Sequence, residues 1–196
     1  MFSWTQFYET GDLEGIRAPS NFAVLAQHHF EPGARIIDIG SGNGRDSTFF
    51  QALGHDVTAV DPCASALAKN ETHKKRLDDA DGVCGAANDF DVVYMRFSLH
   101  SVSEETEDRL FSWARGSRLF CIETRSVHDP RFGRGERVAE NAFSDNGHYR
   151  RFTDLDALVR KALHHGFQVV HASVDFKAAA LPTDQAVVNR LILIQT

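Results

Sequence analysis

The chain has 196 residues, which suits one globular domain over residues 1–196 and leaves little length for a second. Its 42% hydrophobic content can supply a sizeable core, yet no apolar run approaches the roughly 18–20 residues that a membrane span needs. A formal net charge of −6 argues against nucleic acid as the partner. The N-terminal sequence MFSWTQFYETGDLEG lacks a basic segment followed by an apolar one, so we expect a cytoplasmic protein without a secretory signal.

Cysteine and histidine spacing argues against a metal or disulfide framework. Cys63, Cys84 and Cys121 lie far apart and show no CxxC spacing, which fits a reducing compartment. The ten histidines form no HExxH or zinc-finger pattern, so we expect no metal site. The oligomeric state stays open at this point.

Strand-like and helix-like segments alternate along the chain. Residues 1–33 predict a helical cap that ends in a Glu-Pro-Gly turn. The expected strands are residues 34–39, 56–60, 91–95, 117–124, 167–174 and 187–194, with a further short strand between 76 and 88. The expected helices are residues 45–53, 64–75, 104–115 and 153–165. This alternation predicts a mostly parallel sheet with helices on both faces.

Residues 125–151 interrupt the alternation. They are polar, contain Gly133, Gly135 and Gly147, and show no apolar period that would anchor them. We therefore expect a lid-like loop, which leaves the sheet after the strand at 117–124.

A glycine-rich segment, Asp38-Ile39-Gly40-Ser41-Gly42-Asn43-Gly44, follows the first expected strand. Glycines let the backbone turn tightly and let a ligand approach without Cβ atoms in the way. Asp61 ends the next strand, where a carboxylate can accept hydrogen bonds from both hydroxyls of a ribose. A dinucleotide loop would have glycine where this chain has Arg45, and the acid at Asp38 suits a cationic ligand better than a pyrophosphate.

The motifs IIDIGSGNGRDS, VTAVD and FDVVYMRFSLH resemble those of the class I S-adenosylmethionine-dependent methyltransferases. The resemblance implies an α/β fold, a Rossmann-like doubly wound seven-stranded mostly parallel sheet with a C-terminal antiparallel strand. It also implies S-adenosylmethionine as cofactor, with adenine held by Asp79 or its neighbour Asp78. The implied cofactor-binding residues are Asp38, Gly40, Ser41, Gly42, Gly44, Asp61, Pro62, Asp79, Met95, Arg96 and Phe97.

His100 is the candidate catalytic residue, because it follows the fourth expected strand, where it should reach the transferred methyl group. An imidazole there can serve as general base for an alcohol or amine. The alternative is a histidine that only orients the loop. An acceptor oxygen that is already anionic would need positioning and no base.

Basic residues gather in the lid-like segment of an otherwise acidic chain, and guanidinium groups bind phosphate and carboxylate through paired hydrogen bonds. The alternative is that this segment is a solvated loop whose arginines form salt bridges with Asp129, Glu136 and Glu140. The expected acceptor-binding residues are Arg125, Arg131, Arg134, His148, Tyr149 and Arg150.

Together these features predict O-methylation of a small acceptor that bears phosphate, phosphonate or carboxylate, or of a glycan. The segments YMRFSLH, ETRSVHDPRFGRGE and GHYRRF also resemble small bacterial methyltransferases of biosynthetic and surface-glycan pathways. The alternatives are a small-molecule N-methyltransferase and a non-catalytic S-adenosylmethionine-binding regulatory subunit.

Overall fold

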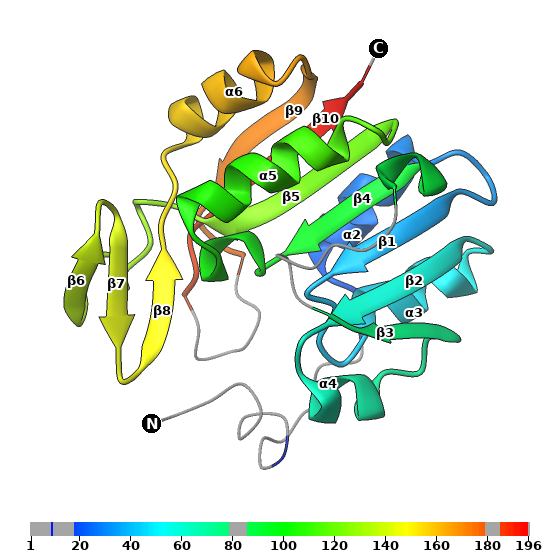
Figure 1. Ribbon diagram of the computed structural model, residues 1–196, viewed down its shortest axis with the longest axis horizontal. Coiled ribbons are helices and arrows are strands. Elements are labelled where there is room, and N and C mark those ends of the chain that lie inside the picture. The colour runs from blue at the N-terminus through cyan, green and yellow to red at the C-terminus, as the bar shows by residue number, and fades with distance from the viewer. Residues whose placement is uncertain (1–8, 10–17, 79–85, 179–184, 196) are drawn as a thin grey trace.

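The computed structural model describes residues 9, 18–78, 86–178 and 185–195, which form a seven-stranded sheet flanked by helices and a second sheet of three strands (Figure 1). The main sheet has the order β3-β2-β1-β4-β5-β10-β9. Its strands are β1 (Arg35–Ile39), β2 (Asp56–Asp61), β3 (Lys74–Leu77), β4 (Val92–Arg96), β5 (Leu119–Arg125), β9 (Gln168–Asp175) and β10 (Val188–Ile194). The helices are α2 (Asn21–Ala26), α3 (Arg45–Ala52), α4 (Ala64–Lys69), α5 (Glu104–Ala114) and α6 (Leu155–His164), with 3-10 turns η1 (Gln27–His29), η2 (Ala87–Asp89) and η3 (Leu99–Ser101).

The predicted fold class is confirmed. Strands β1 to β5 pair in parallel, whereas β10 runs antiparallel to both β5 and β9. The strand order reverses between β1 and β4, and a ligand site is expected outside the carboxyl ends of the strands at such a switch point.

Two apolar layers cover the sheet, and alternation along each strand decides which layer a side chain joins. Val93 and Met95 of β4 pack under α5 and α6, while Tyr94 packs on the other face with α2 and α3. Figure 1 shows α5 and α6 in front of the sheet and α2 and α3 behind it. No helix in the described part of the chain is long and apolar enough to span a bilayer.

The expected helix over 64–75 is wrong in its second half. Helix α4 ends at Lys69, and Lys74–Leu77 forms the edge strand β3 instead. Asn70 ends the helix because its side chain accepts a hydrogen bond from Thr72 N at 2.8 Å, an alternative to the helical pattern. Pairing with β2 then overrides the helix propensity of the lysines that follow.

The expectation of a loop over 125–151 is wrong from residue 136 onward. Strands β6 (Glu136–Ala139), β7 (Ala142–Asp145) and β8 (His148–Arg151) form an antiparallel sheet, called the small sheet below. Asn146 and Gly147 join β7 to β8 with φ values of 53° and 82°, the backbone that a two-residue hairpin turn requires. The Asn-Gly pair was visible in the sequence as a hairpin signal.

Candidate active site

The glycine loop connects β1 to α3 at the carboxyl edge of the sheet. Gly40, Gly42 and Gly44 all have positive φ, at 78°, 56° and 77°. A Cβ on Gly40 would lie 2.3 Å from the Ser98 Cβ, and one on Gly44 would lie 2.2 Å from the Asn70 side chain. Both the conformation and the close neighbours therefore require glycine.

Asp61 secures this loop from the end of β2. Its carboxylate accepts hydrogen bonds from Gly42 N and Cys63 N, both at 2.8 Å. Burial raises the pKa of Asp61, and the two backbone donors oppose that rise. A carboxylate has about four acceptor positions, so two remain for hydroxyl groups of a ligand. Pro62 follows at the exposed surface.

Asp38 lies beneath the loop and is 2% exposed. The Ser47 hydroxyl of α3 donates to it at 2.5 Å, yet burial raises the pKa of Asp38 to about 7. Two buried carboxylates, Asp38 and Asp61, thus lie beside the glycine loop. As hydrogen-bond acceptors with negative charge in their ionised forms, they fit a ligand that carries hydroxyl groups and positive charge, and S-adenosylmethionine has both.

The last two residues of β4 differ in their surroundings. Met95 is 0% exposed inside the core. Arg96 pairs with Glu123 at 2.9 Å and lies 3.8 Å from Asp46. The roles that the resemblance implies for Met95 and Arg96 in cofactor binding stay predictions.

Phe97 has the strained positive φ of 53°, which is uncommon for a residue other than glycine. Its ring lies between two guanidinium groups, with Arg96 at 4.7 Å and Arg125 at 5.2 Å from the ring centre. The next residue, Ser98, donates to Ile39 O at 2.7 Å and so ties this turn to the glycine loop. The strain therefore lies where the cofactor loop meets the turn that carries His100.

His100 is 2% exposed and touches the edge of the Phe97 ring. Burial, and then the positive charges of Arg125, Arg150 and Arg151, lower the pKa of His100 well below its usual value. The imidazole is therefore neutral at pH 7 and is a weak base.

The predicted acceptor-binding residues do not all converge. Arg125 is buried at the end of β5 and pairs with Asp129 at 2.7 Å, so this arginine belongs neither to a solvated loop nor to an open acceptor site. Alternation along β8 puts His148 and Arg150 on one face of the small sheet and Tyr149 on the other. Arg131, Arg134 and Arg150 do meet, in a small pocket that they line with Phe143, Asp145 and Phe152.

Of the two acids suggested for adenine, Asp79 lies outside the described residues. Asp78 is placed, and its N–H donates to Asp61 O at 3.2 Å. The described neighbour of Asp79 is therefore held by the backbone carbonyl of Asp61 at the end of β2.

Sequence reasoning missed Asp46 and Asn70. Asp46, in the first turn of α3, accepts hydrogen bonds from Ser20 N and from the Tyr94 hydroxyl, at 2.7 and 2.9 Å. An acid in a first helical turn was a readable signal, but its partners are distant in sequence. Asn70 packs against Gly44, and nothing local in the sequence indicates that contact.

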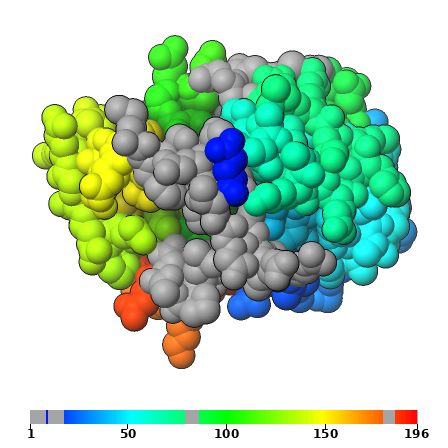
Figure 2. All heavy atoms as spheres, turned by 90° about the horizontal axis from the view of Figure 1, so that it is seen from below, coloured from blue at the N-terminus to red at the C-terminus, as the bar shows by residue number. Residues whose placement is uncertain are grey.

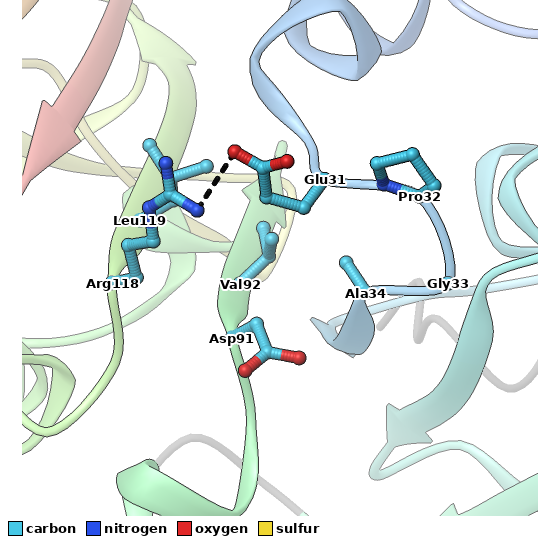
Figure 3. Close-up of a pocket in the computed structure, with 8 residues that line it drawn as sticks. All are labelled: Glu31, Pro32, Gly33, Ala34, Asp91, Val92, Arg118 and Leu119. Carbon is cyan, nitrogen blue, oxygen red and sulfur yellow. Dashed lines mark ion pairs between the residues drawn. The ribbon is translucent and has the colours of Figure 1, made fainter.

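A second pocket lies at the opposite edge of the sheet (Figure 3). It is lined by the loop before β1 and the starts of β4 and β5, and Glu31 and Arg118 pair across it at 3.0 Å. Ligands of open α/β sheets bind at the carboxyl edge, so this pocket lies on the wrong side for the cofactor. Figure 2, seen from below, has the small sheet (yellow-green) and α4 (green) on opposite sides of the molecule.

Residues 16–172 match the family model described as a methyltransferase domain. Among curated proteins, demethylmenaquinone methyltransferase of Renibacterium salmoninarum is 34% identical over 80 residues, which cover 37% of this chain and 32% of that protein. The match thus spans about a third of that relative's length.

Solved structures of methyltransferases share the fold. The Burkholderia thailandensis 1,6-didemethyltoxoflavin-N1-methyltransferase, solved with its acceptor and S-adenosylhomocysteine, has a TM-score of 0.74 at 19% identity, covering 98% of this chain and 85% of that one. A methyltransferase from Methanosarcina mazei has a TM-score of 0.74 at 15% identity, covering 87% and 96%. Magnesium protoporphyrin IX methyltransferase from Synechocystis, solved with S-adenosylmethionine, has a TM-score of 0.64 at 13% identity, covering 89% and 76%.

Proposed function

The chain belongs to the methyltransferase domain family, in the class that uses S-adenosylmethionine, and we propose that it O-methylates a small anionic acceptor. The cofactor supplies an electrophilic methyl group on a positively charged sulfur. The protein has to hold the donor, align the acceptor oxygen with the methyl carbon and exclude water. Its negative net charge of −6 supports a small acceptor rather than a nucleic acid.

On the donor side, we propose that the backbone of Gly40 to Gly44 holds the methionine part of the cofactor. Asp61 accepts from the ribose hydroxyls with the lone pairs that Gly42 N and Cys63 N leave unused. Asp38 lies beneath the loop, and its ionised form favours a ligand with positive charge.

The observation that carries the acceptor proposal is the environment of His100. A neutral, buried imidazole with a strongly lowered pKa is a poor general base. Arg125 and Arg151 are already paired with Asp129 and Glu107, so of the arginines that act on His100 it is Arg150 whose charge we propose to favour an anion. An oxygen that is already ionised needs no base. We therefore assign His100 the role of orienting the acceptor oxygen.

N-methylation is the second candidate. The Burkholderia protein is by its name an N1-methyltransferase, and at 19% identity that likeness concerns the fold. A neutral amine would gain nothing from the positive charge of Arg150 near His100. The third alternative, a non-catalytic cofactor-binding subunit, predicts cofactor binding without turnover.

A labelled-methyl assay tests the proposal. The purified chain is incubated with methyl-labelled S-adenosylmethionine and matched sets of carboxylates, phosphates, phosphonates, their neutral esters and amines, and products are identified by mass. We expect methyl esters from the anions only. With carboxylate acceptors and saturating cofactor the rate should be flat between about pH 6 and 9, because the acceptor carboxylate and His100 keep their charge states.

His100→Gln, which keeps a hydrogen-bond donor, should lose less than about tenfold in kcat under the same conditions. A loss of roughly 10²–10⁴-fold together with a rate that rises through the imidazole pKa would identify His100 as a base for an alcohol and overturn the anionic acceptor. A methylated amine would establish the second candidate.

A further inference from the structure

Phe97 has a backbone conformation that its residue type disfavours. Among the described residues other than glycine, positive φ occurs at Phe97, Asn141 and Asn146, each at 53°. Asparagine reaches this region readily, and both asparagines lie in turns of the small sheet, whereas a bulky aromatic residue there is an outlier. Glycine would form the same turn without strain. A side chain is kept at such a position when its contacts matter more than the strain.

Hydrogen bonds on both sides hold the strained backbone in place. Phe97 N donates to Glu123 O at 2.9 Å and so extends the pairing of β4 with β5. The hydroxyl of the next residue, Ser98, donates at 2.7 Å to the carbonyl oxygen of Ile39, the last residue of β1. The strain therefore persists because two strands fix this turn at the edge of the sheet that carries the glycine loop.

The Phe97 ring contacts three side chains. The guanidinium groups of Arg96 and Arg125 lie 4.7 and 5.2 Å from its centre, within the range of a cation–π contact. The His100 ring stands nearly perpendicular to it, at 85° and with 5.7 Å between ring centres. An aliphatic side chain has no π face for the guanidinium groups, so this set of contacts requires an aromatic ring.

Both arginines that flank the ring already have carboxylate partners. Arg96 pairs with Glu123 at 2.9 Å, and Arg125 pairs with Asp129 at 2.7 Å. The ring is therefore not needed to balance their charges. It packs between the two ion pairs, which fix its position against His100.

The low exposure of His100 depends on the side chains around it. The imidazole is 2% exposed, and its turn η3 packs against β5 and β8. The charged groups that act on it from these strands are Arg125, Arg150 and Arg151, but burial is the larger cause of its lowered pKa. Side chains that keep water from the imidazole therefore decide its charge state. The Phe97 ring is one of them, because it contacts the imidazole directly.

We infer that Phe97 is a positioning residue for methyl transfer, whose ring keeps water from His100 and holds the imidazole in place, and whose strained backbone brings the ring there. This inference rests on the proposed function, in which a neutral His100 orients the acceptor oxygen. It differs from the role that the resemblance implies, because Phe97 then acts on His100 and not on the cofactor.

NMR titration of the His100 imidazole, with S-adenosylhomocysteine present, tests the shielding without any acceptor. Phe97→Ala should raise the proton affinity of His100 roughly tenfold or more, because water then reaches the imidazole. Phe97→Leu, which disturbs folding less, should give a smaller rise in the same direction. Phe97→Tyr keeps the ring and should keep the wild-type titration. An unchanged titration in both Phe97→Ala and Phe97→Leu would overturn the inference.

A comparison of glycine with alanine at position 97 tests the strain. Neither residue has the ring, but glycine adopts positive φ without cost, so the folding equilibrium constant of Phe97→Gly should exceed that of Phe97→Ala roughly fivefold or more in urea unfolding. Asn141→Gly is the control, because it changes a residue with the same φ of 53° and should leave the His100 titration unchanged. Equal stabilities of the two Phe97 variants would overturn the strained turn.

Turnover separates this inference from the proposed function. With an acceptor that the labelled-methyl assay identifies, Phe97→Leu should lower kcat about as much as His100→Gln does and keep the wild-type affinity for S-adenosylhomocysteine. The double variant should lose no more than His100→Gln alone, because Phe97 acts through His100.

Three outcomes of these experiments are decisive. Additive losses in kcat, or weaker cofactor binding with an unchanged His100 titration, would assign Phe97 another role and overturn the inference. If the proposed function fails, anionic acceptors give no product while the His100 titration still responds to Phe97→Ala. If the inference alone fails, turnover persists and Phe97→Leu keeps the wild-type kcat.

Discussion

The glycine loop and the small sheet lie at the same edge of the main sheet, but they are built in different ways. The loop is one contiguous segment whose glycines have positive φ. At Gly40 and Gly44, a Cβ atom would collide with the side chains of Ser98 and Asn70. The small sheet assembles its arginine pocket from the loop after β5 and from strands β7 and β8. Backbone geometry thus defines the loop that we propose for the cofactor, whereas side chains that alternate on strands define the small sheet that we propose for the acceptor. Substitutions should therefore act on stability and cofactor binding in the first region, and on acceptor affinity in the second.

The largest expected effect comes from Gly40→Ala. The new Cβ would lie 2.3 Å from the Ser98 Cβ, and the residue has a φ of 78°, so we expect more than about 4 kcal/mol of lost stability or a collapsed cofactor site. Urea unfolding and calorimetric titration with S-adenosylhomocysteine measure both. Gly33→Ala is the matched control, since its φ is 74° and no atom lies within 4 Å of the Cβ position. It should cost only about 1–2 kcal/mol, and equal costs at the two positions would contradict the close-contact explanation.

Asp38→Asn should change how stability depends on pH. The pKa of Asp38 is raised from 3.8 to about 7, so between these values the unfolded chain has lost a proton that the folded chain keeps, and stability falls as pH rises. The cost of ionising the buried carboxyl reaches on the order of 2–4 kcal/mol above pH 7. The variant should therefore gain stability over the wild type as pH rises from 4 to 8 in urea unfolding. Asp56→Asn, on the exposed start of β2, should show no such gain; a constant difference for Asp38→Asn would refute the buried-carboxyl interpretation.

Arg151→Met tests how the small sheet is attached. In the variant, the buried Glu107 carboxylate keeps Lys161 as a partner at 2.8 Å. The free energy of unfolding should therefore fall by about 1–3 kcal/mol, less than the roughly 3–5 kcal/mol expected when a buried charge loses its only partner. Pairing it with Glu107→Gln in a double-mutant cycle isolates the interaction. Cofactor affinity should stay at the wild-type value, because the glycine loop does not depend on this contact. A large drop in cofactor affinity would mean that the two regions are not separable.

The smallest expected effect is that of Asp61→Ala on cofactor binding. Loss of the ribose acceptor should weaken binding of S-adenosylmethionine and its demethylated product by on the order of 1–2 kcal/mol. Calorimetric titration measures both affinities, and Asp56→Ala on the same strand is the control. Unchanged affinity in Asp61→Ala would remove this carboxylate from the cofactor site.

Much of the fold was predictable because local signals agreed with one another. The helix expected over residues 104–115 is α5, and the Ser103 side chain caps it by accepting a hydrogen bond from Thr106 N at 3.1 Å. Predictions failed where pairing between distant segments decided the outcome. Lysines with good helix propensity became the edge strand β3, and a polar segment without apolar period became the small sheet. For the small sheet, the Asn146-Gly147 pair was the signal in the sequence that indicates a hairpin between β7 and β8.

The sequence by itself determined the class of protein and the cofactor loop. Glycines, an acid two residues before the loop and an acid at the end of the next strand form a local pattern, because the loop is held by its own backbone conformation. Only the tertiary structure decided the chemical states and groupings of the other site residues. Burial and the surrounding arginines make His100 a neutral, weak base, the end of β5 turns Arg125 into a buried partner of Asp129, and strand alternation separates Arg150 from Tyr149. Those properties depend on which distant residues are neighbours, and that information appears only when the chain is folded.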